Sequence, residues 1–275
     1  MRSVTDLTGR GDQIIRKPLL AVIAICWMVG CLHAGEELSK SEVFLRQSEV
    51  TPSAVLVLCP GQNDSSKESI RQKEWIRYAE ANRLALAGYH FESSDELLSS
   101  GKGYFVAGRG SGKALLDGLE CRGAGNLPIY LYGFSGGAHF AMSFAAWAPE
   151  KVAGFCAYSF GWSSPPPEAL RCPAVIVCGE HDGQRYGSTL TYFQEGRRQG
   201  KPWVWVSLGQ KDHSTSRELD DFVRKYFACL LRHDGPPILV DNYTKKVVTG
   251  DPKDIRFSVL PSASLLEQWR RIHHP

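Results

Sequence analysis

Residues 128–147 read PIYLYGFSGGAHFAMSFAAW, and this stretch carries the clearest structural pattern of the chain. Its first part, 128–134, is an apolar run of the kind found in strands that are buried on both faces of a sheet. Its last part, 136–147, consists of small and apolar residues over the length of a helix. The glycine-rich segment GFSGG at 133–137 lies where the two parts meet. The stretch therefore predicts a strand, a sharp turn at Ser135 and a helix.

The same alternation of strand and helix continues on both sides of this stretch. Further strands are predicted from apolar runs at 54–59, 84–91, 152–160, 174–178 and 203–208. Helices are predicted from residue spacing at 66–82, 103–121, 188–198 and 217–231. This order is typical of the α/β class, with a mostly parallel central sheet covered by helices on both faces. Right-handed crossovers place the C-terminal ends of parallel strands along one edge, where ligands bind in such folds.

The pattern changes after residue 232. Residues 237–243 and 256–260 are typical of paired strands, and 261–269 of a capped final helix. We therefore expect a main domain over 35–232 and a small C-terminal β/α appendage, 233–275, packed on the same domain. The polar segment before the first strand is expected to be a linker or an edge segment.

The N-terminus has the pattern of an export signal. Arg16 and Lys17 precede an apolar stretch over 19–32, and the small residues Ala34 and Gly35 lie just beyond it. The apolar stretch is too short for a membrane span, and a basic flank before a short apolar run is typical of a secretory signal. We therefore predict a signal peptide over 1–34 and an extracytoplasmic protein, periplasmic or secreted, with no membrane span in its mature form.

Two other interpretations of the N-terminus stay open. Residues 28–31, Met-Val-Gly-Cys, resemble the box of bacterial lipoproteins. In that case the signal ends at residue 30 and Cys31 carries a lipid anchor. The third interpretation is a retained anchor or a buried helix.

Composition excludes several function classes. The 275 residues carry a formal net charge of +3, and the basic residues are scattered, which argues against a nucleic-acid partner. The eight cysteines include no Cys-x-x-Cys pair, so their spacing follows no metal-binding pattern. We expect mostly free thiols and leave one disulfide open. The segment GRGSGKA at 108–114 resembles a phosphate loop but has Ala114 where that loop needs Ser or Thr.

The segment at 133–137 has the Gly-x-Ser-x-Gly pattern, and its predicted context is strand, turn and helix. This is the context of a nucleophile elbow, in which a tight turn raises the serine hydroxyl above the edge of the sheet. The N-terminus of the following helix favours negative charge beside that hydroxyl. The sequence therefore makes Ser135 a candidate nucleophile, against the simpler interpretation of a plain glycine-rich turn.

A serine hydroxyl needs a base, and the base needs an orienting acid. His213 lies in a loop after the last predicted core strand, and Asp182 follows the strand that ends at residue 178. Together with Ser135 they lie at C-terminal strand ends in the chain order Ser, Asp, His. We therefore predict Ser135, His213 and Asp182 as a catalytic triad.

Other residues near the predicted site are weaker candidates. An adjacent side chain rarely points at its neighbour, which places Asp212 well below Asp182 as the partner of His213. Glu180 is a second, weaker acid. His139 lies one turn past Ser135, so we interpret it as a packing or pocket residue.

Acyl transfer also needs hydrogen-bond donors for the developing oxyanion. The N–H of Gly136 follows the candidate nucleophile directly. The second donor is expected in the loop after the first core strand, at the N–H of Gln62, where an ordinary turn is the alternative. Aromatic residues near strand ends are candidates for substrate binding: Phe134, Trp162 and Tyr186.

These motifs resemble those of the α/β-hydrolase superfamily, and within it polyhydroxybutyrate-depolymerase-like and dienelactone-hydrolase-like esterases. The resemblance covers about residues 55–231 and rests on LCPGQ at 58–62, residues 75–91, GFSGG at 133–137, GEHD at 179–182 and DH at 212–213. Those families usually have His-Gly at the oxyanion loop, where this chain has Pro60-Gly61. The resemblance implies an α/β-hydrolase fold, with 35–232 as the catalytic domain, and hydrolysis of a carboxylic ester through an acyl-enzyme.

We therefore predict a serine esterase that acts on a small-molecule ester without a cofactor or a metal. Two alternatives stay open: a serine peptidase of the same fold acting on small peptides, and a non-catalytic binding protein on a hydrolase scaffold. The sequence does not indicate the oligomeric state.

Overall fold

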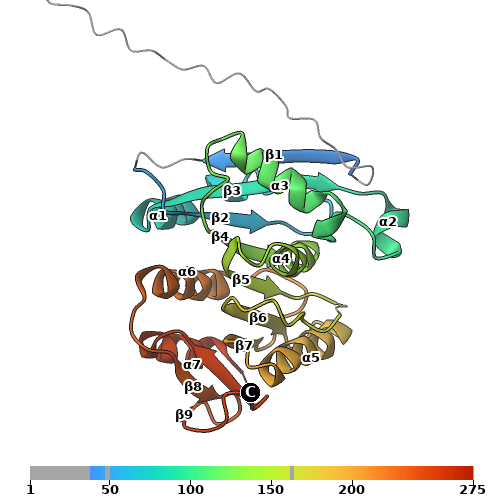
Figure 1. Ribbon diagram of the computed structural model, residues 1–275. Helices are drawn as coiled ribbons and strands as arrows, with labels where there is room; N and C mark the ends of the chain where they lie inside the picture. The colour runs from blue at the N-terminus through green and yellow to red at the C-terminus, as the bar shows by residue number, and fades with distance from the viewer. Residues whose placement is uncertain (1–37, 47–49, 162–163, 275) are drawn as a thin grey trace, which may run out of the picture. The chain divides into compact units, whose positions relative to one another are not determined.

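A computed structural model describes residues 38–46, 50–161 and 164–274. Its main sheet has seven strands in the order β1-β3-β2-β4-β5-β6-β7 (Figure 1). The strands are β1 (Lys40–Arg46), β2 (Ala54–Cys59), β3 (Leu84–Glu92), β4 (Ile129–Phe134), β5 (Val152–Tyr158), β6 (Ala174–Gly179) and β7 (Trp203–Leu208). All are parallel except β1, which pairs antiparallel with β3. The predicted α/β class and mostly parallel sheet are confirmed.

Helices cover both faces of this sheet. On one face pack α3 (Ser111–Glu120), α4 (Gly136–Trp147) and α5 (Gln184–Arg198); on the other pack α1 (Lys73–Ala81), α6 (Arg217–Arg232) and α7 (Leu266–Ile272). The continuous apolar strands are buried as expected, since all six residues of β2, β6 and β7 are buried. The start of α6 follows from its sequence, because the Ser216 side chain accepts the Leu219 N–H.

Some predicted boundaries were wrong. The helix expected over 66–82 is a short 3-10 turn, Ser69–Arg71, followed by α1. The helix expected over 103–121 is also shorter: a 3-10 turn, Ala107–Arg109, precedes α3, and Gly110 between them has φ 118°. A positive φ of this kind favours glycine and interrupts a helix.

Two elements were not predicted as such. The polar segment before β2 contains the edge strand β1, in which only Val43 is buried. A short helix, α2 (Asp95–Ser99), lies between β3 and α3 and begins at Ser94, whose side chain accepts the Leu97 N–H.

The C-terminal tail forms a second, three-stranded sheet in the order β10-β8-β9. Its strands are β8 (Ile238–Asp241), β9 (Val247–Val248) and β10 (Phe257–Leu260), and the 3-10 turn Ala263–Leu265 leads into α7. The pairing of β8 with β10 agrees with the strands expected at 237–243 and 256–260.

This tail covers the outer edge of β7. The N–H of Trp205 donates to Ser258 Oγ at 2.8 Å, and its carbonyl accepts Trp269 Nε1–H at 2.9 Å. The N–H of Ser207 donates to His273 Nδ1 at 3.1 Å, and its carbonyl accepts the N–H of His274 at 2.8 Å. Unpaired backbone groups on an edge strand are a liability, and the tail satisfies them here. The tail thus supports the strand that leads to His213.

His273 makes the tail sensitive to acid. It is fully buried, Nδ1 accepts the Ser207 N–H, and Nε2–H donates to the Asn242 carbonyl at 2.7 Å. Burial, with a smaller contribution from Lys245, lowers the pKa of His273 to about 4. Between pH 6.5 and 4 the unfolded chain therefore binds a proton that the folded chain does not bind. Hence the free energy of unfolding falls as the pH falls through this window, by about 3 kcal/mol in total.

Urea unfolding at pH 7, 5.5 and 4.5 tests this expectation. The wild type is expected to lose more stability than His273→Gln, whose side chain has no proton to gain. Equal slopes for the two proteins between pH 6.5 and 4 would contradict it. Their difference isolates His273 from the other groups that titrate in the same range.

Candidate active site

The sharp turn between β4 and α4 carries Ser135. Its backbone has φ 54° and ψ −119°, a strained conformation for a residue with a side chain. Close packing explains the neighbouring glycines: a Cβ on Gly133 would lie 2.2 Å from the Gly137 carbonyl oxygen, and one on Gly137 would lie 2.2 Å from the Cys59 oxygen. The turn therefore depends on both glycines.

The three predicted triad residues meet at the C-terminal ends of their strands. Ser135 follows β4, Asp182 follows β6, and His213 follows β7. His213 Nε2 lies 2.9 Å from Ser135 Oγ. His213 Nδ1 lies 2.9 Å from Asp182 Oδ2 and 3.1 Å from Asp182 Oδ1. One unbroken line of hydrogen-bonding atoms thus joins the hydroxyl, the imidazole and the carboxylate.

The surroundings hold this line in place. The Asp182 side chain is 1% exposed and the His213 side chain 32% exposed, so the carboxylate is shielded while the imidazole reaches solvent. The loop of His213 is anchored through Lys211, whose carbonyl accepts the His181 N–H at 2.7 Å. The Tyr158 hydroxyl donates to the Ser214 carbonyl on the other side of His213. The ring of Phe134 lies against the imidazole, with centroids 4.9 Å apart.

The weaker candidates for the acid lie elsewhere. Asp212 accepts a hydrogen bond from the Ser214 hydroxyl at 2.5 Å, and Glu180 accepts the Gln210 N–H at 3.1 Å. Among the hydrogen bonds of the described residues, neither of these carboxylates is bonded to the His213 ring.

The two predicted oxyanion donors are neighbours in space. A Cβ on Gly136 would lie 3.0 Å from both the N and the Cα of Gln62. Among the hydrogen bonds of the described residues, neither N–H has an acceptor. Two free N–H groups therefore lie beside Ser135.

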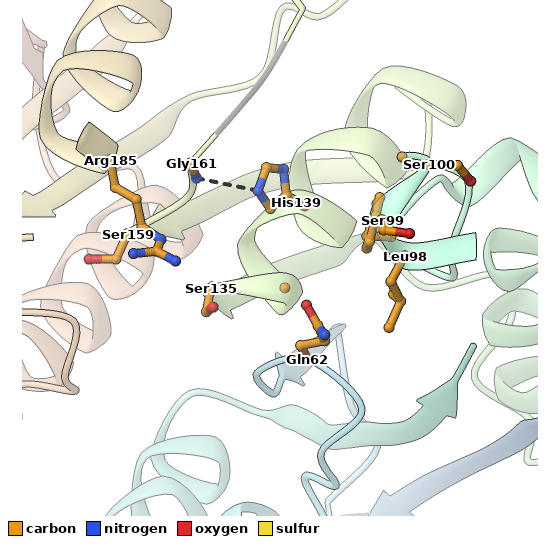
Figure 2. Close-up of a pocket in the computed structure, with 12 residues that line it drawn as sticks. Gln62, Leu98, Ser99, Ser100, Ser135, His139, Ser159, Gly161 and Arg185 are labelled. Carbon is orange, nitrogen blue, oxygen red and sulfur yellow. Dashed lines mark hydrogen bonds between the residues drawn. The ribbon is translucent and has the colours of Figure 1, made fainter. Parts of the chain in front are cut away.

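A cavity of about 480 Å³ opens above Ser135 (Figure 2). Ser135 and Gln62 lie at its base, Arg185 and Ser159 flank it on one side, and Gly136 also lines it. The rest of the wall consists of His139, Gly161, Phe105 and residues of the α2 region, namely Leu98, Ser99, Ser100 and Gly101. The cavity thus combines apolar and polar side chains.

Two polar residues of this wall, His139 and Arg185, have hydrogen-bond partners in the protein. Burial, assisted by the charge of Arg185, lowers the pKa of His139 to about 4, so its ring is neutral near pH 7. His139 Nε2 accepts the Gly161 N–H at 3.4 Å (Figure 2), which places the ring proton on Nδ1. Arg185 Nη1 lies 3.3 Å from Asp182 Oδ1, and its side chain is 47% exposed. His139 is thus a pocket residue, one of the two roles expected for it.

The predicted aromatic residues are placed differently from one another. Phe134 contacts His213 and Tyr158 but does not line the cavity above Ser135. Tyr186 donates to Ser207 Oγ at 3.1 Å, packs on Trp205, and is likewise absent from that wall. Trp162 lies outside the described residues, as do the predicted signal over 1–34 and Cys31.

Sequence reasoning missed Arg185 and the α2 region. The spacing of three residues between Asp182 and Arg185 at the start of a helix is a usable signal for Arg185, because such residues face each other. The loop and short helix that supply Leu98 and Ser99 carry no motif.

Metal binding, disulfides and membrane spans also concern the described part of the chain. There, no group of three His, Cys, Asp or Glu side chains is arranged to hold a metal ion, and all six cysteines are free. No helix in the described ranges has both the length and the apolar character needed to cross a bilayer.

Comparison with solved structures identifies the fold. The esterase PE8 is 16% identical, covers 70% of this chain and 99% of its own, and superposes with a TM-score of 0.54. The dienelactone hydrolase of Anabaena variabilis is 14% identical over 68% of this chain and 90% of its own, with a TM-score of 0.51. This chain has the α/β-hydrolase fold. The resemblance inferred from the motifs is thereby confirmed at the level of the fold.

A third structure of the α/β-hydrolase fold is FphF, a fluorophosphonate-binding serine hydrolase of Staphylococcus aureus. It is 15% identical over 70% of this chain and 92% of its own, with a TM-score of 0.51. No family model matches the sequence, and no curated protein matches it. At these identities the likeness establishes the α/β-hydrolase fold, and the chemistry has to be argued from the site.

Proposed function

We propose that this protein is a serine hydrolase that cleaves carboxylic esters through an acyl-enzyme on Ser135. The observation that carries the proposal is the continuous contact from Ser135 Oγ through His213 to Asp182, on a strained turn beside two free N–H groups. A serine on a plain structural turn needs neither a base nor a buried carboxylate behind that base.

In the proposed acylation step, Ser135 Oγ attacks the ester carbonyl carbon while His213 Nε2 takes the hydroxyl proton. His213 Nδ1–H donates to Asp182, which holds the ring in this tautomer and stabilises the imidazolium that forms. The carbonyl electron pair moves to oxygen, and the N–H groups of Gly136 and Gln62 stabilise that oxyanion. The tetrahedral intermediate then collapses, its bond to the alcohol oxygen breaks, and His213 returns the proton to the leaving alcohol.

The proposed deacylation step repeats this sequence with water. His213 Nε2 takes a proton from water, and the hydroxide oxygen attacks the acyl carbon. The bond to Ser135 Oγ breaks, Oγ regains its proton from His213, and a carboxylic acid leaves. Each proton in the cycle is carried by His213, the one base in contact with Ser135 Oγ among the described residues.

The cavity above Ser135 supports a small-molecule substrate. Leu98 and Phe105 offer apolar surface to this cavity, and Arg185, across it from Leu98 in Figure 2, supplies a positive charge. A volume of about 480 Å³ suits a small molecule. The proposed location is extracytoplasmic, a proposal that rests on the sequence of residues 1–34 alone.

Labelling and turnover together test the proposal. Purified protein is expected to react with a fluorophosphonate probe at Ser135, located by mass spectrometry of the labelled peptide, and to hydrolyse p-nitrophenyl acetate and butyrate. Chromogenic dipeptides are expected to be much poorer substrates. Faster turnover of dipeptides than of esters would favour a peptidase, and the absence of both activities and of labelling would favour a binding protein.

A further inference from the structure

The peptide unit between Gly61 and Gln62 has to be held in one orientation for the proposed oxyanion site to form. The Gly61 carbonyl and the Gln62 N–H belong to this one planar unit, and in a trans peptide they point to opposite sides. Whatever holds the Gly61 oxygen therefore sets the direction of the Gln62 N–H. A Cβ on Gly61 would meet no atom within 4 Å, so steric contact at this residue does little to prevent a rotation.

Two donors hold the Gly61 oxygen. One is the N–H of Asp64, at 3.2 Å, which belongs to the same turn. The other is the Tyr104 hydroxyl, also at 3.2 Å, from a segment 43 residues further along the chain. Only the second bond relates the peptide unit to the rest of the molecule.

Tyr104 is itself firmly placed. It is 2% exposed, its N–H donates to Ser93 Oγ at 2.8 Å, and its carbonyl accepts the Ser111 hydroxyl at 2.5 Å. Its ring contacts those of Tyr89 and Phe105, with centroids 6.3 Å and 5.9 Å away. Burial raises the pKa of the Tyr104 hydroxyl far above its ordinary value, and a backbone interaction with Asn63 offsets only part of this rise. The hydroxyl therefore keeps its proton and remains a donor.

Hydrogen bonds through Asn63 and Ser93 connect the oxyanion loop to Tyr104 a second time. The Asn63 side-chain amide donates to the Ser93 carbonyl at 3.1 Å, and the Ser93 N–H donates back to Asn63 Oδ1 at 3.2 Å. Ser93 in turn receives the N–H of Tyr104, whose hydroxyl reaches Gly61. The oxyanion loop is thus tied at two points to one buried cluster.

We propose that Tyr104 is a positioning residue that keeps the Gln62 N–H directed at the oxyanion. This inference rests on the proposed acyl transfer at Ser135. The Tyr104 hydroxyl lies beside the elbow, since a Cβ on Gly136 would meet it at 2.6 Å. Without the hydroxyl only the Asp64 N–H of the same turn holds the Gly61 oxygen, which makes rotation of the peptide unit easier. A rotated unit turns the Gly61 carbonyl, a negative dipole end, toward the developing negative charge. Loss of the Tyr104 hydroxyl therefore destabilises the transition state and leaves the binding of the substrate unchanged.

The test is Tyr104→Phe, which removes the hydroxyl and keeps the ring. Because the loss of one oxyanion donor lowers kcat by about 10²–10³-fold in other enzymes, we expect kcat for p-nitrophenyl butyrate to fall by about 10–100-fold. KM is expected to stay within about twofold. Rates are normalised to active sites titrated with the fluorophosphonate probe, so that misfolded protein does not contribute.

A tetrahedral inhibitor gives a second readout that a purely structural defect would not produce. Binding of a trifluoromethyl ketone, which forms an oxyanion on Ser135, is expected to weaken by the same factor as kcat/KM. The pH midpoint of the rate is expected to stay unchanged, because His213 is untouched.

The matched control is Tyr89→Phe. Its ring belongs to the same cluster, and its buried hydroxyl has no oxygen or nitrogen partner in the described residues, so its kinetics are expected to match the wild type. An active wild type with Tyr104→Phe within twofold of it, or a loss shared equally by Tyr89→Phe, would overturn the role of Tyr104 alone. A wild type without ester turnover or labelling would overturn the proposed function and this inference with it.

Discussion

Ser135→Ala is expected to lower kcat/KM for p-nitrophenyl butyrate by about 10⁴–10⁶-fold, the range seen when a triad member is removed from other serine hydrolases. The Ala variant keeps the cavity, the two free N–H groups and the turn, so the loss would measure covalent chemistry. His213→Ala is expected to cost about as much, because the hydroxyl then has no base at 2.9 Å.

The double variant Ser135→Ala/His213→Ala separates a triad from a set of independent contacts. Residues that act as one unit are not additive, so the double variant is expected to be no slower than the slower single variant. Asp182→Asn is expected to cost about 10⁴-fold, because an amide no longer favours the required His213 tautomer.

His181→Ala is the matched control for these variants. Its side chain is exposed, directly precedes Asp182, and contributes only its backbone N–H to the His213 loop. It is expected to stay within twofold of the wild type. Retention of more than a tenth of the activity by Ser135→Ala would contradict the assignment of the nucleophile.

Arg197→Met is expected to lower the free energy of unfolding by about 3–5 kcal/mol. The Arg197 side chain is 0% exposed and donates to three carbonyl oxygens, those of Phe257 at 2.7 Å, Lys201 and Pro252. Burial lowers the pKa of Arg197 to about 10, which still leaves it charged at neutral pH. A methionine of similar length fills the space but makes none of these three bonds, and of the three carbonyls that of Lys201 still accepts the Trp203 N–H at 2.8 Å.

Arg198→Met is the control, since Arg198 is the next residue of α5. Its guanidinium is exposed, and its partner is the exposed Glu195, so its removal is expected to cost less than about 1 kcal/mol. Urea unfolding at pH 7 measures both. Because two of the three carbonyls belong to the tail, Arg197→Met is also expected to make residues 233–274 more sensitive to protease, and similar stabilities for the two variants would contradict this account.

Six strands of the main sheet could be predicted from the sequence, because each is a short apolar run buried on both faces. β1 could not be recognised as a strand, since it pairs on one side only and buries just Val43. Its place beside β3 depends on pairing with residues 40 or more positions away, from Arg46 with Leu86 to Lys40 with Glu92, which leaves no local pattern. The start of α3 was predicted wrongly for a related reason. The helix is interrupted at Gly110 by one backbone angle, φ 118°, which the sequence pattern does not indicate.

Ser135, Asp182 and His213 could be proposed from the sequence, because parallel strands bring their C-terminal ends to one edge. Each of the three residues lies within five positions of the end of such a strand. The order of strands and helices along the chain is therefore enough to predict the candidate triad. It does not predict the roles of Tyr104 or Arg197, whose side chains bond to carbonyls that lie 43 and 60 residues away in the sequence. Burial periodicity and strand order are properties of a chain segment, whereas the direction of a single peptide unit is decided by a hydroxyl 43 residues away.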